Sequence, residues 1–312
     1  MSVLRRVRVR VPASTSNIGP GFDCLGMALG LYNELEVEMH SEDGPPVVEI
    51  EGEGAQCLPK DKSNLMVRAA RTVVAGRFSN RLVFKARNRI PLARGLGSSA
   101  AAIVAGLFAA NRLMDPPPLT DEQLFDYAVV LEGHPDNVAP AVRGGVTLSI
   151  KEARSLRTVA LQPHKDLVAV VCIPDFRLET AKARAVLPET VLREAAVENV
   201  ARALLLASAI ERGRWQDLAA AMGDRLHQPY RAPLIPGLRD VLQAALAAGT
   251  CGAALSGSGP AVLALCRRGP QARAIGAAMV KAFAKHKTAS RAEVLPLERS
   301  GVRVSTLQPR EA

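Results

Sequence analysis

The sequence predicts an α+β fold in two parts, on the strength of three observations. Its 312 residues suit one large or two ordinary domains, at about 150 residues per domain. Alternating apolar and polar residues mark strands, and helical periodicity marks helices, but the two do not follow one another one for one. That order favours α+β over a doubly wound sheet. With 48% hydrophobic and 22% charged residues, the chain can bury a core.

The N-terminal stretch is predicted to be strand-rich. Residues 7–11 alternate valine with arginine, and Pro12 is expected to end this strand. A loop rich in Ser, Thr, Asn and Gly then extends to about Gly30. A second alternating stretch occupies 34–39, and 47–51 is predicted to be its hairpin partner across a Gly-Pro-Pro turn.

Helices and strands are then expected in mixed order. A helix begins at Ser63 or Asn64, both good N-caps, and Thr120 caps another. In the first half we expect helix 64–75, strand 82–87, helix 98–114, helix 120–131 and strand 146–150. In the second half we expect strand 167–173, helices 190–212, 215–222 and 238–248, a strand-loop-strand unit at 251–266, helix 271–285 and two closing strands.

Composition excludes several classes of protein. The longest apolar run, 100–110, is shorter than the roughly 20 residues of a membrane span, and no signal peptide is expected. Five cysteines without a CxxC pair argue against a disulfide framework or zinc site and favour the cytoplasm. The net charge of +10 is compatible with nucleic acid, but three Tyr and one Trp offer few stacking platforms. On charge alone, a solvated basic surface and an anionic ligand remain equally open.

A glycine-serine segment carries the strongest chemical signal. Gly95 and Gly97 let the backbone bend closely around a ligand, and Ser98 and Ser99 stand where a helix begins. The unpaired N–H groups and positive dipole of a first helical turn bind phosphate. Taken alone, the segment could also be an ordinary capped turn, and it is neither a Walker loop nor a Rossmann fingerprint. The full segment is Pro91-Leu92-Ala93-Arg94-Gly95-Leu96-Gly97-Ser98-Ser99-Ala100-Ala101.

Two further segments, 12–23 (PASTSNIGPGFD) and 252–260 (GAALSGSGP), complete a pattern. With the glycine-serine segment between them, the chain resembles the GHMP kinases over nearly its whole length. That family has an N-terminal substrate loop, a phosphate loop and a C-terminal Gly-Ser-Gly-Pro loop in this order. The resemblance implies a ribosomal-protein-like N-terminal lobe, residues 1–152, and a ferredoxin-like C-terminal lobe, residues 153–312. It also implies ATP and Mg²⁺ as cofactors.

Within that family, the first segment and 132–141 (EGHPDNVAPA) resemble the members that act on L-homoserine. The Gly-Glu-His segment of galactokinases and mevalonate kinases is absent, as is the Lys-x-Asn-Leu start of the methylerythritol branch. The resemblance implies transfer of the γ-phosphoryl group of ATP to the homoserine hydroxyl, a step of threonine biosynthesis. Another acceptor, such as shikimate or a different amino alcohol, is the nearest alternative.

The resemblance also suggests roles for individual residues. Glu132, with Ser98 as its partner, would hold Mg²⁺, because hard oxygen ligands suit that ion. Asn64 would contact adenine, or serve only as a helix N-cap. Asp136 would be a general base or would brace its loop, since a loose transition state needs little deprotonation of the alcohol. The catalytic set is therefore Glu132, Ser98, Asp136 and Asn137, and the ATP-binding set is Asn64 and residues 91–101.

The charges of a zwitterionic substrate suggest the remaining site residues. Arg184 and Arg231 would clamp its carboxylate and Asp23 would accept from its ammonium group. Each arginine could equally be a surface charge, and His134 a structural histidine. The substrate-binding set is Asn17, Asp23, His134, Asn137, Thr180, Arg184 and Arg231.

The expected partner is the small-molecule substrate, L-homoserine. Neither nucleic acid nor a membrane is expected as a partner, and a homodimer is the oligomeric state considered. A nucleic-acid-binding protein and a binding-only pseudokinase are the alternatives from other classes. The paired Glu132 and Ser98 and the lack of an aromatic platform argue against the former, and the intact loops give no reason to prefer the latter.

Overall fold

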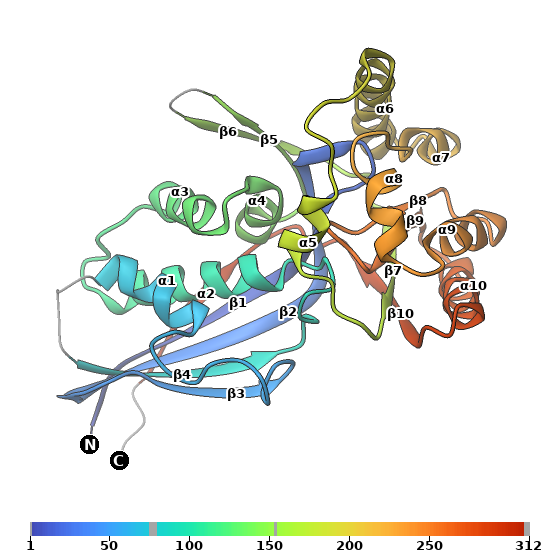
Figure 1. Ribbon diagram of the computed structural model, residues 1–312. Helices are drawn as coiled ribbons and strands as arrows, with labels where there is room; N and C mark the ends of the chain where they lie inside the picture. The colour runs from blue at the N-terminus through green and yellow to red at the C-terminus, as the bar shows by residue number, and fades with distance from the viewer. Residues whose placement is uncertain (1, 75–79, 153–154, 309–312) are drawn as a thin grey trace.

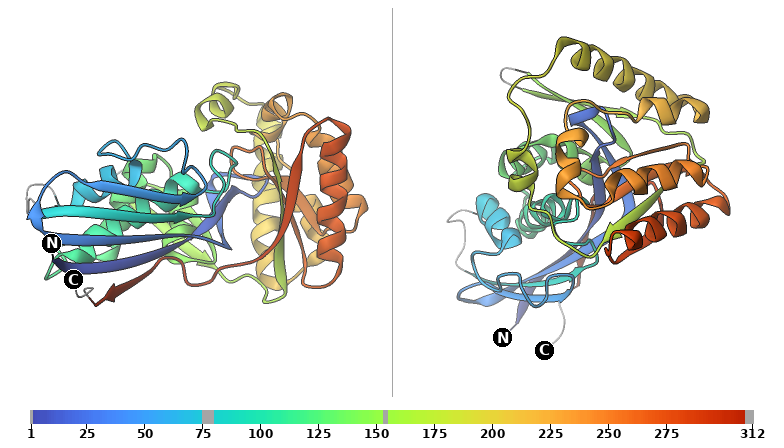
Figure 2. Two further views of the ribbon diagram at one scale, coloured as in Figure 1. Left: turned by 90° about the horizontal axis from the view of Figure 1, so that it is seen from below. Right: turned by 45° about the vertical axis from the view of Figure 1, so that its right-hand side comes forward.

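The computed structural model describes residues 2–74, 80–152 and 155–308, which form two β-sheets with helices packed against them (Figure 1). Helices α1 to α4 lie on one face of the larger sheet, and α9 and α10 flank the smaller one (Figures 1 and 2). This arrangement confirms the predicted α+β class. Among the described helices, none has the length and hydropathy to cross a bilayer.

The larger sheet has the order β11-β1-β2-β4-β3, with β5 pairing β2 and β6 pairing β5. The smaller sheet has the order β10-β7-β9-β8 and is antiparallel throughout. The strands of the larger sheet are β1 (Val3–Asn17), β2 (Gly21–Asp43), β3 (Val47–Gly52), β4 (Asn80–Asn88), β5 (Val146–Lys151), β6 (Leu156–Leu161) and β11 (Arg303–Leu307). Those of the smaller sheet are β7 (Leu167–Pro174), β8 (Gly252–Leu255), β9 (Val262–Arg267) and β10 (Ser290–Pro296).

Helices connect and cover these sheets. Thr120 caps α3 with a reciprocal capping box to Gln123, as its sequence context predicted. The first-half helices are α1 (Leu65–Val74), α2 (Ser98–Leu113), α3 (Asp121–Glu132) and α4 (Pro135–Arg143). The second-half helices are α5 (Thr180–Ala185), α6 (Arg193–Arg212), α7 (Leu218–Ala221), α8 (Gln228–Arg231), α9 (Leu238–Ala247) and α10 (Gln271–Lys285). The short helices α4, α5 and α8 and strand β6 had not been predicted.

The predicted loop from Pro12 to Gly30 is wrong. The pairing of β1 with β2 continues to the register Asn17↔Gly21, so this segment is the far end of a long hairpin. Its polar side chains suggested a loop, but they are buried and hydrogen-bonded to distant residues. A polar run can form a buried strand when tertiary partners satisfy it.

The predicted hairpin between 34–39 and 47–51 is also wrong. β3 pairs in parallel with β4, and β4 stands between β2 and β3. β2 already has β1 on one side and β4 on the other, which leaves no free edge along 34–39. The local turn therefore does not set the pairing.

The two sheets do not divide at residue 152. β6 and β11 both lie beyond that position, yet both belong to the larger sheet. β11 pairs with β1 in the register Arg8↔Ser305, so the end of the chain returns to its beginning. One continuous hydrophobic core runs through the first sheet and into residues of the second, such as Ala169 and Leu263.

The contact between α1 and α2 gives a stability prediction. A Cβ on Gly106 would stand 2.3 Å from the carbonyl oxygen of Met66, so the two helices meet too closely for any side chain. Gly106→Ala should lower the free energy of unfolding by about 1–3 kcal/mol, as expected for overpacking. Helix propensity alone predicts the opposite, a gain of up to about 1 kcal/mol. Urea unfolding decides between them, and a stabilised variant would contradict this packing.

Candidate active site

The glycine-serine segment forms a tight loop at the start of α2. Gly95 and Gly97 have φ of +74° and +69°, the left-handed region that side chains rarely adopt. A Cβ on Gly97 would stand 2.0 Å from the Ser14 hydroxyl oxygen, so this position also lacks space. No side chain caps the first turn of α2. Its backbone N–H groups and the positive end of its dipole are available to an anion.

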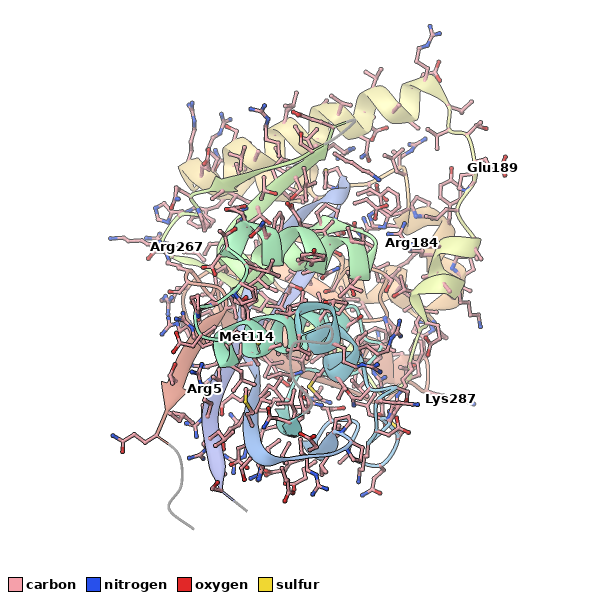
Figure 3. The ribbon with its side chains drawn as sticks, turned by 90° about the vertical axis from the view of Figure 1, so that its left-hand side faces the viewer. Arg5, Met114, Arg184, Glu189, Arg267 and Lys287 are labelled. Carbon is pink, nitrogen blue, oxygen red and sulfur yellow. The ribbon has the colours of Figure 1, made fainter. Side chains whose placement is uncertain are left out.

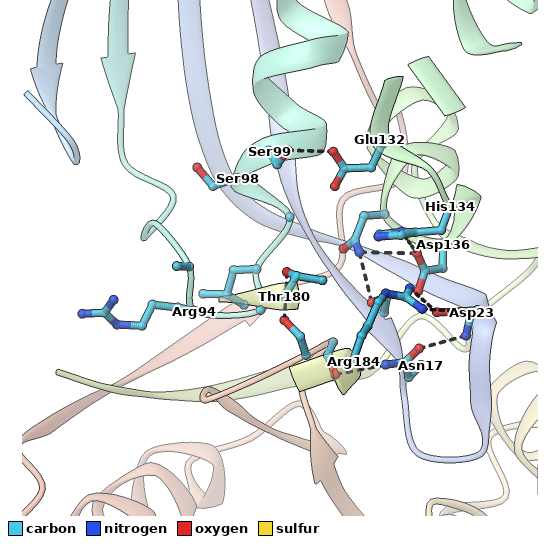
Figure 4. A pocket seen from close by; sticks show the side chains of 18 of the residues that line it. Asn17, Asp23, Arg94, Ser98, Ser99, Glu132, His134, Asp136, Thr180 and Arg184 are labelled. Atoms are coloured by element: carbon cyan, nitrogen blue, oxygen red, sulfur yellow. Dashed lines mark hydrogen bonds and ion pairs between the residues drawn. The ribbon is translucent and has the colours of Figure 1, made fainter. Parts of the chain in front are cut away.

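A polar cavity of about 100 Å³ opens beside this loop (Figure 4). It collects residues from distant parts of the chain, including most of those that the sequence singled out. From the phosphate loop the lining includes Pro91, Ala93, Arg94, Gly95, Leu96, Gly97, Ser98 and Ser99. The other lining residues are Ser16, Asn17, Asp23, Glu132, His134, Asp136, Asn137, Thr180, Arg184, Arg231, Gly257 and Ser258.

Glu132 ends α3 at the mouth of this cavity and pairs with a serine of the loop. Its Oε2 accepts a hydrogen bond from the Ser99 hydroxyl at 2.7 Å (Figure 4). Ser98 lines the same cavity, and its pairing with Glu132 around Mg²⁺ stays a prediction. Burial raises the pKa of Glu132, and the Ser99 hydrogen bond opposes that shift only in part. A nearby cation would stabilise the carboxylate.

His134, Asp136 and Asn137 form a connected network at the start of α4. The His134 Nδ1 and Asp136 Oδ1 atoms are 2.7 Å apart, and Asp136 is only 2% exposed. Asn137 donates to the Ser16 hydroxyl at 3.1 Å and accepts from the Ser14 hydroxyl at 2.9 Å. Burial lowers the pKa of His134, but the hydrogen bond and charge of Asp136 outweigh it, so the net shift is upward. The network ties α4 to β1.

Asp23 and Arg184 face one another across the cavity. Both guanidinium nitrogens of Arg184 donate to the carboxylate, at 2.9 and 2.8 Å, which is a bidentate pair. Arg231 is 2% exposed and donates to the backbone oxygens of Ala183 and Gly257 at 3.1 Å. Burial, with the charge of Arg184, lowers the pKa of Arg231 to about 10. Asp23 therefore lies beside two cations, and Asp136 also acts on both of them.

The C-terminal Gly-Ser-Gly-Pro loop joins the two other motifs. The Ser256 hydroxyl lies 2.8 Å from the Thr15 hydroxyl and donates to the Gly95 oxygen at 2.7 Å. Asn17 donates to the Gly257 oxygen at 3.0 Å, and its own Oδ1 accepts from the Asp23 backbone N–H. Three segments that are far apart in sequence thus meet at one point.

A second cavity, of about 450 Å³, lies on the other side of the phosphate loop and is largely apolar. Asn64 lines it, but its amide caps α1, accepting from the Met66 N–H at 3.0 Å and donating to the Pro59 oxygen. Both of its proposed roles are therefore compatible. The lining includes Asn33, Leu58, Pro59, Asn64, Leu65, Met66, Asn88, Leu92, Ala93, Ser98, Ser99 and Thr180.

The sequence reasoning missed part of both cavities. Asn33 and Asn88 stand on neighbouring strands, and only the pairing of β2 with β4 places them together. Ser14 and Ser16 lay in the quoted N-terminal segment without an assigned role. Conversely, Ala100 and Ala101 are fully buried and line neither cavity, because they face the core.

Comparison with known proteins bears on this geometry. The family models for the GHMP kinase N-terminal and C-terminal domains match residues 64–145 and 206–285. The chain belongs to the GHMP kinase family. A homoserine kinase of Moorella thermoacetica is 47% identical over 279 residues, which are 89% of this chain and 92% of that one. A homoserine kinase of Desulfitobacterium hafniense is 42% identical over 96% of this chain and 99% of that one.

Solved GHMP kinase structures have the same fold. A homoserine kinase of Cytophaga hutchinsonii superposes with a TM-score of 0.87 at 30% identity, over 96% of this chain and 97% of that one. A mevalonate kinase of L. major shares the fold with a TM-score of 0.70 at 19% identity. The resemblance noted from the three loops is thereby confirmed.

The His134–Asp136 contact predicts a measurable titration. His134 should titrate above the ordinary histidine pKa of about 6.5. Asp136→Asn should lower the pKa of His134, because burial lowers this pKa and the carboxylate that raises it is then gone. Because the pKa of His134 is raised in the folded protein, the His134–Asp136 pair stabilises the fold below pH of about 6.5. This contribution is lost as pH rises through the folded pKa of His134. NMR titration of the imidazole checks this, and an unchanged pKa in the variant would contradict the contact.

Proposed function

We propose that the protein transfers the γ-phosphoryl group of ATP to the hydroxyl of L-homoserine, giving O-phospho-L-homoserine and ADP. One observation supports this most: the apolar cavity and the polar cavity share Ala93, Ser98, Ser99 and Thr180, so the phosphate loop lies between them. A nucleoside in the apolar cavity would direct its phosphates along the start of α2 toward the polar cavity. Phosphoryl transfer needs this positioning more than it needs covalent chemistry.

The donor set fits a magnesium nucleotide. The uncapped turn of α2 would hold phosphate oxygens, and Glu132 with the Ser98 hydroxyl, beside the Ser99 hydroxyl that contacts Glu132, would hold the metal ion as hard oxygen ligands. Bound there, Mg²⁺ would neutralise charge on the phosphates. Within the described residues, no group of three or more His, Cys, Asp and Glu side chains forms a protein-only metal cluster. A metal ion shared with phosphate oxygens is the arrangement that this single carboxylate suits.

The charges of the polar cavity fit a zwitterion. Arg184 and Arg231 bring two positive charges to the cavity beside Asp23, and Asp136 also acts on both arginines. A substrate carboxylate would pair with the arginines, and an ammonium group would take a share of Asp23. A buried charge without a partner costs several kcal/mol, so an acceptor with both charges suits this site better than a neutral alcohol.

The acceptor hydroxyl is proposed to lie near the network at α4. The raised pKa of His134 favours the imidazolium, a donor, so this ring is suited to hold an oxygen rather than to remove a proton. Asp136 is engaged by His134 at 2.7 Å and faces Asn137 at 3.5 Å, which favours a bracing role over that of a free base. Such a site needs no strong base when the transition state is loose.

This activity would place the protein in threonine biosynthesis in the cytoplasm. All five cysteines are free, which suits a reducing compartment.

The metal role of Glu132 predicts a dependence on pH and Mg²⁺. Glu132→Gln keeps the shape of the side chain and its contact with Ser99 but removes the charge, so turnover should fall by about 100-fold or more. In the native protein, Mg²⁺ affinity should fall as pH falls through the raised pKa of Glu132, at a higher pH than for an exposed glutamate. ADP release at a series of Mg²⁺ concentrations measures both effects. Native turnover by the variant at limiting Mg²⁺ would show that Glu132 is no ligand.

Carboxylate recognition is tested at Arg184. Arg231 is the less suitable position, because its substitution would also remove hydrogen bonds to two backbone oxygens, those of Ala183 and Gly257. Arg184→Leu should lower kcat/KM for homoserine by about 10- to 100-fold and change it little for 3-aminopropanol, which lacks the carboxylate. Lys182→Leu, an equal loss of charge at an exposed position of the same helix, is the matched control. Equal losses with both acceptors would reject the clamp, and a panel including shikimate tests the alternative acceptors.

A further inference from the structure

A buried histidine, His227, contacts the guanidinium group of Arg231. This histidine is fully buried and directly precedes α8, and its Nδ1 atom is 3.2 Å from Nη1 of Arg231. Its Nε2 atom is 2.8 Å from the carbonyl oxygen of Gly19 and 3.6 Å from the carboxylate of Asp224. Because Gly19 lies in the turn between β1 and β2, the imidazole joins that turn to α8.

These partners decide which nitrogen of the imidazole carries the proton. A guanidinium nitrogen only donates, so Nδ1 accepts from Arg231, and a carbonyl oxygen only accepts, so Nε2 donates to Gly19. The ring is therefore neutral, with its proton on Nε2. Burial lowers the pKa of His227, and the charge of Asp224 opposes that shift only in part, which also favours the neutral ring.

Every hydrogen-bond acceptor of Arg231 is consequently uncharged. Its Nε and Nη1 donate to two backbone oxygens, and Nη1 also donates to His227. Within the described residues, no carboxylate accepts from this guanidinium, and those of Asp23, Asp224 and Asp136 act on it only at longer range. Its Nη2 donates to none of the described residues, so two N–H groups are available to a ligand in the cavity that Arg231 lines.

An aromatic ring supports the same group. Phe22, the residue before Asp23, stacks on the imidazole with ring centroids 5.2 Å apart and an angle of 22° between the planes. The guanidinium carbons of Arg231 and Arg184 lie 5.4 and 5.8 Å from the centre of the Phe22 ring, which attracts cations. Arg184 reaches this group from α5 (Figure 3). The imidazole, the phenyl ring and both guanidinium groups are therefore packed together beside the polar cavity.

We propose that His227 is a positioning residue for the carboxylate of the acceptor: its neutral imidazole fixes the guanidinium of Arg231 through Nδ1 and holds the turn before Asp23 through Nε2–H. This inference rests on the proposed function, because it requires an acceptor that carries a carboxylate. A neutral acceptor at Nη1 orients the guanidinium without competing for its charge, whereas a carboxylate there would pair with it. A histidine that only filled space would need neither hydrogen bond.

Two substitutions separate the hydrogen bonds of the imidazole from its volume. His227→Leu removes both bonds and should raise KM for homoserine by about 10- to 30-fold, with kcat and KM for ATP within about 3-fold of native. His227→Asn places its Oδ1 as many bonds from Cα as Nδ1, so it can accept from Arg231 and should return KM for homoserine to within about 3-fold of native.

The acceptor without a carboxylate and a second histidine provide the controls. With 3-aminopropanol, neither variant should change KM by more than about 3-fold, because Arg231 then has no carboxylate to bind. His286→Leu removes an exposed histidine that lines neither cavity of the site, and should leave KM for homoserine unchanged. Circular dichroism and thermal unfolding verify that each variant folds.

Three kinetic outcomes overturn the proposal. The first is a native KM for homoserine in His227→Leu. The second is a His227→Asn variant as impaired as His227→Leu, because then the acceptor at Nδ1 does nothing. The third is an equal loss with 3-aminopropanol, which is what a purely structural histidine would produce.

A measurement on the native protein separates this proposal from the proposed function. NMR of the imidazole nitrogens, assigned by comparison with His227→Asn, should show a neutral His227 with its proton on Nε2 at pH of about 7. A protonated ring or a proton on Nδ1 overturns the positioning role, even where the protein phosphorylates homoserine. A native protein with this tautomer that phosphorylates no homoserine overturns the proposed function instead, while it supports the contact with Arg231.

Discussion

The active site depends on the burial of polar side chains at the end of the first hairpin. Ser14, Thr15, Ser16 and Asn17 are each 3% exposed or less, in a position where a strand would ordinarily bury apolar side chains. Their hydrogen bonds reach α4 and the Gly-Ser-Gly-Pro loop. A buried polar group without a partner is costly, so these contacts hold the three loops in one arrangement.

That arrangement explains the conformations around the site. Among the described residues, Asn17, Ile18, Asp23, Ala93 and Lys287 have positive φ without being glycine. Asn17, Asp23 and Ala93 line the polar cavity, and Ile18 follows Asn17 directly. Such conformations cost free energy and persist where the surroundings fix them. Two hydrogen bonds hold these residues in place. The Asp23 N–H donates to the Asn17 side chain, and the Asn17 side chain donates to the Gly257 oxygen. The loops are therefore held in place by the second lobe.

The outer helix α6 is connected to the same loop. Asn199, on its inner face, donates to the Pro20 oxygen and accepts from the Arg225 N–H at 3.1 Å. Pro20 lies in the turn between β1 and β2, three residues before Asp23. Through Asn199, helix α6 supports the turn that precedes Asp23.

The sequence by itself determined the local elements and the chemistry of the loops. Helix caps such as Thr120 and the apolar periods of α2 and α10 depend on neighbours in sequence, so they could be predicted. The three motif loops likewise contained most of the residues that line the polar cavity, and the sequence singled out Glu132 and Arg184 outside those loops.

Only the tertiary structure decided the pairing and the partners. β3 joined β4 rather than β2 because both edges of β2 were occupied, which no turn sequence reveals. Glu132 came within hydrogen-bond distance of Ser99, and Asn33 came beside Asn88, through contacts made across more than 30 residues. The polar run 14–17 became a buried strand for the same reason. A sequence pattern records local preference, whereas long-range hydrogen bonds decide which buried polar groups are satisfied.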